Sequence, residues 1–315
     1  MLTSAAVKAK ARELGFDACG VAPAADLPEL PFFRDWLDRG YAGEMSYLAR
    51  SAARRADVRH VLPSAKTVIV TATNYNTDRP YSTESRETGR AHIARYAWGD
   101  DYHDVLLERM EALLAWMRLV SDEPFEARPY VDTGPVQERV YARHAGIGWI
   151  GKNTCVISPT IGSWTLLAEI ICSLPLELDE PGFDQCGACT LCLEACPTQA
   201  LVAPGVLDAG RCVSYLTIEL RSAIPDPLQQ GVGTHVYGCD VCQEVCPWNA
   251  VAPVSEDPVW QPRPVWDGAD VAGLSAMTDE ELSGALRGSA MRRTKVSGMR
   301  RNLQVATENL TEVRK

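Results

Sequence analysis

Apolar residues repeat at helical intervals over residues 2–14, which predicts a first helix. A short strand is predicted directly after it, over residues 16–21. Residues 67–72 (TVIVTA) are an uninterrupted, mostly β-branched apolar run, which is typical of a central strand. Two further apolar runs cover residues 154–158 and 163–174. Because their apolar character is nearly continuous, we expect these strands to belong to a sheet that is buried on both faces.

A long amphipathic helix is predicted from Asp100 to Val120, because its apolar residues return to one face at intervals of three and four. The segment that follows a short strand, VDTGPVQERVYARHAGIGWIGKN, carries helical signals of its own. Pro135 suits the first helical position, and Gly146 suits the end of the helix. Asp132 would then lie just before a helix N-terminus, where backbone N–H groups favour an anion.

Alternating strands and helices over residues 1–178 predict one α/β domain. Residues 179–250 are rich in cysteine, and we expect metal clusters to replace much of a hydrophobic core there. A connector rich in proline and tryptophan opens the last stretch, residues 251–315, which continues into predicted helices and a basic segment. The 315 residues are therefore expected to form an α/β domain, a cysteine-rich insert and a C-terminal extension.

Eight of the eleven cysteines lie in the cysteine-rich insert. The first run reads C-x-x-C-x-x-C-x-x-x-C-P, the spacing of bacterial two-cluster ferredoxins, in which the fourth cysteine binds the other cluster. The second run has the same pattern with one thiol missing, and Cys212 can supply it. We therefore expect two [4Fe-4S] clusters. The predicted ligands of one cluster are Cys186, Cys189, Cys192 and Cys246, and those of the other are Cys196, Cys212, Cys239 and Cys242.

Other uses of these cysteines fit the sequence less well. Disulfides are typical of short secreted chains, and the start of this chain, MLTSAAVKAKARELG, does not have the charged and apolar regions of a secretory leader. Structural zinc sites use cysteine pairs separated by a spacer, which is a different pattern. The remaining thiols, Cys19, Cys155 and Cys172, lie in apolar stretches and are expected to be small buried hydrophobic residues.

Composition and charge narrow the class of protein further. No apolar stretch approaches the roughly 18 residues of a membrane span, so we expect a cytoplasmic protein in which the thiolates stay reduced. The net charge of −10 argues against indiscriminate nucleic-acid binding. A local basic segment near the end is equally consistent with phosphate binding and with a solvated helix surface. Its six residues are Arg287, Arg292, Arg293, Lys295, Arg300 and Arg301.

Five segments, taken together and in order, resemble the epoxyqueuosine reductase family of cobalamin-dependent iron–sulfur enzymes. They are GYAGEMSYLAR, RYAWGDDYH, VDTGPVQERVYARHAGIGWIGKN, RCVSYLTIELRSAIP and GCDVCQEVCPWN. The resemblance implies an α/β (α+β) cobalamin-binding domain related in architecture to nitroreductases and reductive dehalogenases, with an inserted two-[4Fe-4S] bacterial ferredoxin-like domain. It also implies an oxidoreductase activity, namely reduction of the epoxide of epoxyqueuosine at the tRNA wobble position to give queuosine.

The same resemblance implies roles for particular residues. Asp132 matches the proton donor beside the corrin. Burial there would raise the pKa of its carboxyl and the helix N-terminus would lower it, and the sequence leaves that balance open. The residues expected to contact cobalamin are Arg50, Asp132, Ile157, Ala168, Ile171, Ser214, Arg221, Cys239 and Asp240. The residues expected to contact tRNA are Arg292, Arg293, Lys295, Arg300 and Arg301.

The implied partners are a tRNA with a queuosine-type (GUN) anticodon and an external low-potential electron donor such as flavodoxin or ferredoxin. We expect a monomer that does not associate with a membrane. Two alternatives remain at this point. A reductive dehalogenase acting on a small molecule would typically carry a twin-arginine export signal. A simple electron-transfer ferredoxin would not need an α/β domain of this size or Asp132 in its setting.

Overall fold

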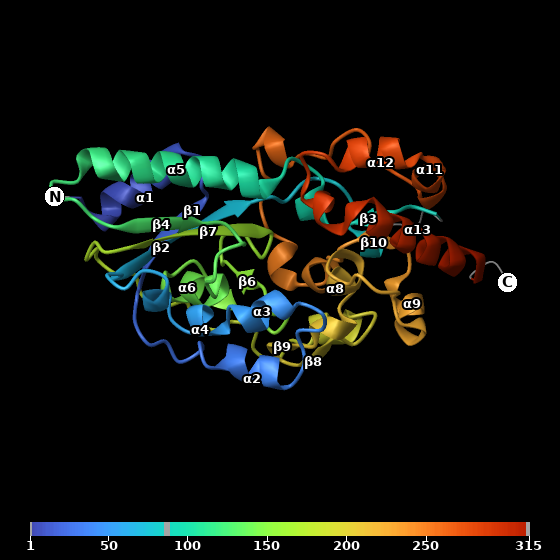
Figure 1. The fold of residues 1–315 in the computed structure, drawn as a ribbon, viewed down its shortest axis with the longest axis horizontal. Coiled ribbons are helices and arrows are strands. Elements are labelled where there is room, and N and C mark those ends of the chain that lie inside the picture. The colour runs from blue at the N-terminus through green and yellow to red at the C-terminus, as the bar shows by residue number, and fades with distance from the viewer. Residues whose placement is uncertain (1, 85–88, 313–315) are drawn as a thin grey trace.

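A four-stranded antiparallel sheet forms the centre of the N-terminal half of the protein (Figure 1). The computed structural model describes residues 2–84 and 89–312. The strand order is β1-β2-β7-β4, with β1 at Ala18–Pro23, β2 at Thr67–Asn74, β7 at Thr165–Cys172 and β4 at Ala127–Tyr130. Strand β2 is buried throughout and β7 almost throughout, as expected of a sheet covered on both faces. The run at residues 154–158, expected in the same sheet, instead gives a two-residue strand at Val156–Ile157 that pairs with Trp149–Ile150 in a separate sheet. All three strand pairings are antiparallel, so the mixed α/β fold is of the α+β kind.

Helices α1 (Ser4–Glu13) and α5 (Tyr102–Val120) cover one face of this sheet (Figure 1). The start of α5 is set by Asp101, whose side chain accepts a hydrogen bond from the backbone N–H of His103. The apolar stripe that predicts this helix is fully buried in the core, at Leu106, Met110, Leu113 and Met117. Sequence periodicity and tertiary packing therefore agree for α5.

The other face of the sheet is covered by α6 (Glu138–His144) and by short elements around it. Gly146 follows α6 with a positive φ of 71°, as its predicted role at the helix end requires. The short elements are α2 (Phe32–Asp38), α3 (Ser46–Arg50), α4 (Ala52–Arg55), β5 (Trp149–Ile150) and β6 (Val156–Ile157).

The predicted start of α6 is wrong, because the helix begins at Glu138 rather than at Pro135. Asp132 has a φ of 54°, so the chain turns sharply after β4. Gly134 passes against the ring of Tyr130 so closely that a Cβ atom there would lie 2.5 Å from the ring. Because these turns occupy the residues after Asp132, α6 begins only at Glu138, six residues after Asp132.

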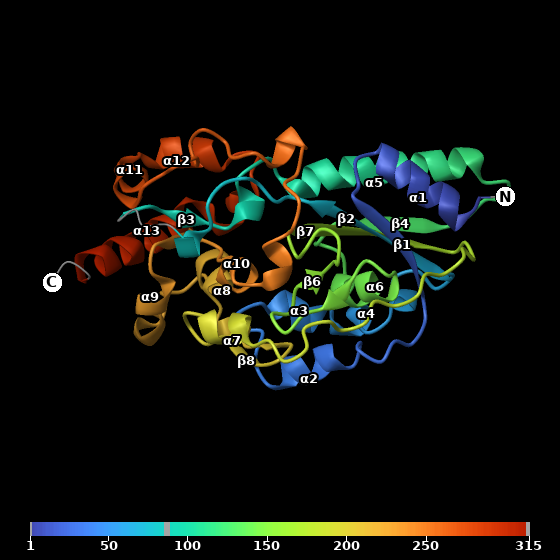
Figure 2. The same ribbon diagram turned by 180° about the vertical axis from the view of Figure 1, so that it is seen from behind.

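The cysteine-rich stretch folds into short elements that lie between the sheet and the C-terminal helices (Figures 1 and 2). Its strand β10 (His235–Tyr237) pairs in parallel with β3 (His92–Ile93), so the stretch is joined to the N-terminal part by a sheet. The other elements are α7 (Leu191–Ala195), β8 (Leu201–Ala203), β9 (Val206–Leu207), α8 (Val213–Ile218), α9 (Asp226–Val232) and α10 (Val241–Glu244).

The C-terminal stretch contains α11 (Val271–Ala276), α12 (Asp279–Leu286) and α13 (Lys295–Glu312). A capping box between Thr278 and Glu281 fixes the start of α12, as the sequence TDEE predicts. Helix α13 packs against α8, α9 and β10 of the cysteine-rich stretch (Figure 2). In the part of the chain that the structure describes, no helix combines the length and the hydrophobicity of a membrane span.

Candidate functional site

Asp132 lies at the end of β4, where its carboxylate is held by a short hydrogen-bonded chain of side chains. Its Oδ2 is 3.3 Å from Nε2 of His103, and Nδ1 of the same histidine is 2.8 Å from Oδ1 of Asp101. Tyr102 also donates a hydrogen bond to Asp132 from the first residue of α5. The side chain of Asp132 is 58% exposed, yet burial still acts on the pKa of its carboxyl; we call this accessible but partly shielded position the Asp132 recess.

The charge of this site is set by His103. Burial alone would lower the pKa of its imidazole, but hydrogen bonds to Asp101 and Asp132 outweigh burial and raise the pKa to about 9. Burial likewise raises the pKa of Asp132, and the hydrogen bond and charge of His103 outweigh it, so that the pKa is lowered. The balance that the sequence leaves open is therefore decided by a histidine, not by a helix N-terminus.

Two further carboxyl groups lie behind Asp132. Glu138 opens α6, and Glu169 lies in the middle of β7 with no exposed surface. Sequence reasoning assigned no role to either residue, or to His103. The one available signal was Glu169 itself, since a charged residue that interrupts an apolar strand must be neutralised or paired.

The thiols of the first predicted cluster converge on one place. Burial raises the pKa values of Cys192 and Cys246. The nearby charges of Cys186 and Cys189 raise both of these pKa values further. N–H groups also point at these sulfur atoms. The indole Nε1 of Trp149 donates to Cys186 Sγ over 3.4 Å, and backbone N–H groups next to Cys246 donate to its thiol. Hydrogen bonds of this kind stabilise thiolates and tune cluster potentials.

The thiols of the second predicted cluster also lie together. Cys212 is close to Cys196 and to Cys239, and Cys239 is in turn close to Cys242. The N–H of Ala200 donates to Cys196 Sγ over 3.2 Å. The structure thus brings the eight thiols into the two predicted groups, including the exchange of one thiol between the runs.

Three features qualify this arrangement. Cys155 is not an isolated hydrophobic residue, because its thiol is within hydrogen-bond reach of Cys242. Cys172 is buried against Thr67 in the sheet, as expected of a small hydrophobic residue. Among residues 2–84 and 89–312, no three His, Cys, Asp or Glu side chains are grouped as the ligands of a single metal ion would be. Each thiolate of a cubane cluster binds a different iron, which spreads the four thiols apart.

The residues predicted to contact a corrin come from several separate elements, namely β6, β7, α3 and the cysteine-rich stretch. The side chains of Ile157, Ala168 and Ile171 are buried, and those of Ala168 and Ile171 pack into cores on opposite faces of β7. A ligand could therefore meet this strand only through its edge. Strand β4 pairs with residues 169–172 of β7, so the edge over residues 165–168 has no strand beside it on that side. This free edge fits a ligand that is held by backbone groups.

The remaining predicted corrin contacts are on the cysteine-rich side or on α3. Ser214 directs its hydroxyl and its N–H at the thiol of Cys212. Arg50 is exposed, and its Nη1 donates to Ser46 over 2.8 Å. Arg221 is exposed and donates to the carbonyl of Arg293 over 3.1 Å.

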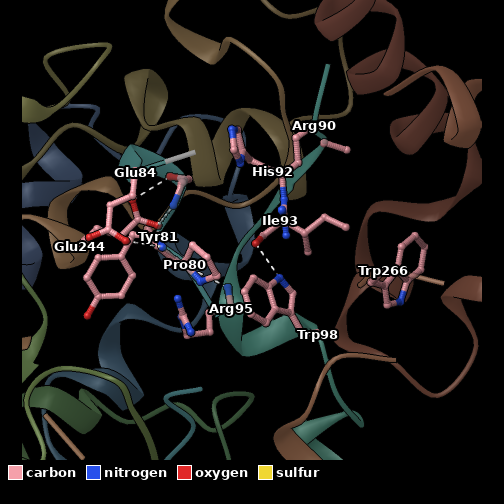
Figure 3. Close-up of a pocket in the computed structure, with 13 residues that line it drawn as sticks. Pro80, Tyr81, Glu84, Arg90, His92, Ile93, Arg95, Trp98, Glu244 and Trp266 are labelled. Atoms are coloured by element: carbon pink, nitrogen blue, oxygen red, sulfur yellow. Dashed lines mark hydrogen bonds between the residues drawn. The ribbon is translucent and has the colours of Figure 1, made fainter. Parts of the chain in front are cut away.

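Asp240 is one of the residues that line a cavity of about 360 Å³, whose lining also includes Tyr81, Arg95 and Trp98 (Figure 3). Its Oδ2 accepts a hydrogen bond from the backbone N–H of Arg95 over 2.6 Å. The guanidinium of Arg95 lies between the rings of Tyr81 and Trp98, 5.2 and 4.8 Å from their centroids. The carboxylate of Asp240 is thus already hydrogen-bonded within the protein. If Asp240 contacts a corrin, the contact would be made by its backbone atoms.

The predicted tRNA contacts divide into two kinds. Arg300 pairs with Asp279 over 2.9 Å, and Arg301 donates to three backbone carbonyls of the cysteine-rich stretch, so both serve the fold. Arg293 pairs with Glu219 over 2.9 Å. Arg292 and Lys295 are exposed, and the side chain of neither residue makes a hydrogen bond or ion pair with the described residues.

Arg292 and Arg293 nevertheless lie close to the Asp132 recess. The charge of Arg292 acts on Asp101, and the charge of Asp132 acts on Arg293. The guanidinium of Arg293 is also 5.6 Å from the ring centroid of Tyr47, at the start of α3. A basic and aromatic rim therefore surrounds the opening that leads to Asp132.

Comparison with protein families identifies both halves of this arrangement. Residues 185–249 match the family of 4Fe-4S double cluster binding domains. Residues 55–133 match the family described as epoxyqueuosine reductase QueG, DUF1730. The first match covers all eight predicted cluster ligands, from Cys186 to Cys246.

Individual relatives extend the similarity over nearly the whole chain. An epoxyqueuosine reductase of Gloeobacter violaceus is 43% identical over 311 residues, which cover 96% of this chain and 95% of the relative. A crystal structure of an epoxyqueuosine reductase with an epoxyqueuosine-modified tRNA-Tyr stem loop aligns with a TM-score of 0.87 and 31% identity, covering 98% of this chain and 81% of the other. The enzyme from Bacillus subtilis, described with its catalytic aspartate loop swung out of the active site, aligns with a TM-score of 0.85 and 30% identity, covering 98% and 82%.

Proposed function

The chain belongs to the epoxyqueuosine reductase family, and we propose that it reduces the epoxide of epoxyqueuosine in tRNA to the alkene of queuosine, using cobalamin and two [4Fe-4S] clusters. The observation that carries this proposal is that the same chain holds two groups of four thiols and an accessible, hydrogen-bonded Asp132. A chain with only an electron-transfer function has no use for the Asp132 recess.

Removal of an epoxide oxygen as water requires two electrons and two protons. The electrons enter through the clusters, whose potentials are set by thiolate ligation, hydrogen bonds to sulfur and burial. N–H donors such as the indole of Trp149 and the amide of Ala200 are already in place for thiolate ligands. We assign the first cluster to Cys186, Cys189, Cys192 and Cys246, and the second to Cys196, Cys212, Cys239 and Cys242.

When bound, cobalamin would supply the strongly reducing cobalt centre that the protein itself does not have. The free edge of β7 around Ala168 would hold it from the sheet side. Ser214 and Arg221 would face it from the cysteine-rich side, and Arg50 from α3. Asp132 would donate a proton to the epoxide oxygen as a carbon–oxygen bond breaks. Its positive φ places this residue on a turn, and the Bacillus subtilis relative is described with its catalytic aspartate loop swung out of the active site.

For tRNA, we propose that anticodon-loop phosphates meet Arg292 and Lys295. These two cations have no internal partner among the described residues, so they are available to phosphate oxygens at no cost in lost ion pairs. Arg293 and Tyr47 would flank the nucleoside as it enters the recess. We propose that the protein works as a cytoplasmic monomer, and that a flavodoxin or ferredoxin supplies the electrons.

The decisive test is a reconstitution. Protein with fully loaded clusters is incubated anaerobically with cobalamin, a strong reductant and tRNA that carries epoxyqueuosine, and the tRNA is then digested to nucleosides. We expect queuosine to appear, and we expect it to depend on added cobalamin. A preparation that contains eight irons per chain and binds cobalamin, but forms no queuosine, would refute the proposed function.

A further inference from the structure

Glu169 is an acidic residue in a place where an ionised carboxylate is strongly destabilised. It lies in the middle of β7, opposite Val70 of β2 and Tyr130 of β4, and its side chain has no exposed surface. Neither of its carboxylate oxygens has a hydrogen-bond donor among the described residues. Isolated charges in an apolar interior are costly, and such a group stays neutral unless it finds a counter-ion.

The partner of Glu169 is a second carboxyl group. Its side chain is within hydrogen-bond reach of the carboxyl of Glu138, which opens α6 on the same face of the sheet. Oε1 of Glu138 is also buried and without a donor in the described part of the protein. Two carboxylates cannot hydrogen-bond to each other, because both are acceptors only. The contact becomes favourable when one proton lies between them, as in carboxylate pairs that share a proton.

The charges around the pair support a retained proton. Burial, followed by the negative charge of Asp132, raises the pKa of Glu138 to about 8. Burial and the charges of Glu138 and Asp132 raise the pKa of Glu169 well above its usual value. Arg55 of α4 and Arg139 of α6 act in the opposite direction, but each already donates to a backbone carbonyl, of Val136 and Thr154 respectively.

The pair is connected to the opening of the site. The backbone N–H of Asp132 faces the carboxylate of Glu138, and the side chain of Asp132 contacts His103 and Tyr102. A line of acidic groups therefore runs from the recess into the sheet. Glu138 is partly exposed and Glu169 is fully buried, so the pair can exchange protons with solvent through Glu138.

We propose that Glu138 and Glu169 share one proton, and that this pair delivers the protons of the reaction through Asp132. The inference rests on the proposed function for its chemistry. Asp132 is a carboxylate at rest, because His103 lowers its pKa, so it must be protonated before it can act as an acid. The shared proton passes from Glu138 through Asp132 to the epoxide oxygen as one carbon–oxygen bond breaks, with two electrons delivered from the clusters. Glu138 then takes up a proton from solvent, and this second proton follows the same path to the resulting hydroxyl group. The second carbon–oxygen bond breaks as the alkene forms, and the oxygen leaves as water.

His103 cannot take this role as easily. Its imidazolium is held between two carboxylates and has a pKa of about 9, so loss of its proton would also remove the ion pairs with Asp101 and Asp132. Transfer from Glu138 to Asp132 is uphill at rest, because the pKa of Asp132 is lowered. It becomes favourable when the strongly basic oxygen of the opened epoxide withdraws the proton of Asp132. His103 and the carboxyl pair therefore act through Asp132 and have positioning roles. Among these acidic and basic groups, only Asp132 touches the substrate.

The shared proton can be observed without turnover. Infrared spectra of the cluster-loaded protein, with 13C-labelled glutamate, should show a protonated carboxyl band at pH 7 that disappears as the pH rises through about 8. The double variant Glu138→Gln/Glu169→Gln should abolish this band, and Glu169→Gln alone should shift its frequency and midpoint, because Glu138 then has no second carboxyl with which to share its proton. The matched control is Glu111→Gln on the exposed face of α5, which should leave it unchanged. Wild-type protein without a protonated glutamate band at pH 7 would overturn the proposal even if the variants did not fold.

Single-turnover kinetics test the role in the reaction. In wild-type protein the rate of queuosine formation should fall as the pH rises through about 8. Glu169→Gln should lower the rate roughly 100-fold and remove this pH dependence, and Glu138→Gln should do the same. A variant that binds cobalamin more weakly but keeps the wild-type pH profile would instead place the pair in cofactor binding and overturn the proposal. If the wild-type protein shows the band but forms no queuosine, the proposed function is refuted, and so is the role of the pair as a proton source. The shared proton itself would still be supported by the band.

Discussion

The pKa of His103 offers a direct measure of the charge chain at Asp132. Its rise from 6.5 to about 9 corresponds to roughly 3 kcal/mol of extra interaction with the protonated form, before any correction for solvent. About a third of the side chain is exposed, so screening reduces this figure, and two carboxylates share what remains. Asp132→Asn removes one of the two charges and keeps a hydrogen-bonding side chain. We therefore expect it to lower the pKa of His103 by roughly 1 unit, to about 8.

The measurement is a proton NMR titration of the histidine rings. The chain has only five histidines, so their signals can be assigned by substitution. Asp101→Asn is the matched variant, and it should lower the same pKa by a similar amount because that carboxylate contacts the other ring nitrogen. His92, whose pKa is lowered to about 4 by burial and by the neighbouring His235, contacts neither carboxylate and should keep its pKa in both variants. A wild-type His103 that titrates near 6.5, or one that Asp132→Asn leaves unmoved, would refute this account of the site.

The remaining predictions concern turnover, tRNA binding, cluster chemistry and stability. Asp132→Ala should abolish queuosine formation while the clusters and bound cobalamin remain visible in the absorption spectrum; substantial activity would remove Asp132 from the mechanism. Arg292→Ala combined with Lys295→Ala should weaken tRNA binding and flatten its dependence on log salt by about one unit per lost phosphate contact, as measured by filter binding. Arg300→Ala is the contrasting variant and should instead lower the melting temperature with the salt slope unchanged; equal slopes in both variants would place the tRNA elsewhere. Trp149→Phe removes an N–H donor to sulfur and should lower the reduction potential of one cluster in a redox titration, without loss of iron. Because the pKa of His103 is raised, its interactions stabilise the fold fully below pH 6.5, and this stabilisation should be lost as the pH rises through about 9 in urea unfolding; His103→Gln should not show the loss.

The sequence is most informative where chemistry or local geometry dictates it. Cluster ligands must recur at spacings that let thiolates reach a common cubane, so Cys212 and Cys246 could be placed in opposite groups without a structure. Helix α5 could be predicted because its cap, its apolar stripe and its tertiary packing all agree. Both features depend on residues that are close in sequence or constrained by a shared ligand.

The sequence is least informative where a residue's role depends on a distant neighbour. His103 meets Asp132 from another element, and nothing in the local pattern of either residue indicates the contact. Glu169 and Glu138 are 31 positions apart and face each other only because β7 and α6 pack together. The beginning of α6 was misplaced for a related reason: Pro135 is a valid start signal, but the turn at Asp132 uses the residues that would form the first helical turn.

The basic C-terminal segment shows why composition alone could not decide between phosphate binding and a solvated surface. Neither alternative describes the whole segment, because the side chains of Arg300 and Arg301 are engaged in contacts within the protein while those of Arg292 and Lys295 are exposed. The net charge of −10 does not prevent a tRNA from approaching these two. At physiological salt, charges more than about 8 Å apart are largely screened, so the phosphates respond to the rim of the Asp132 recess rather than to the chain as a whole. Protonation acts in the same direction, since the raised pKa values of Glu138 and Glu169 reduce the negative charge that these two carboxyl groups present to an incoming anion.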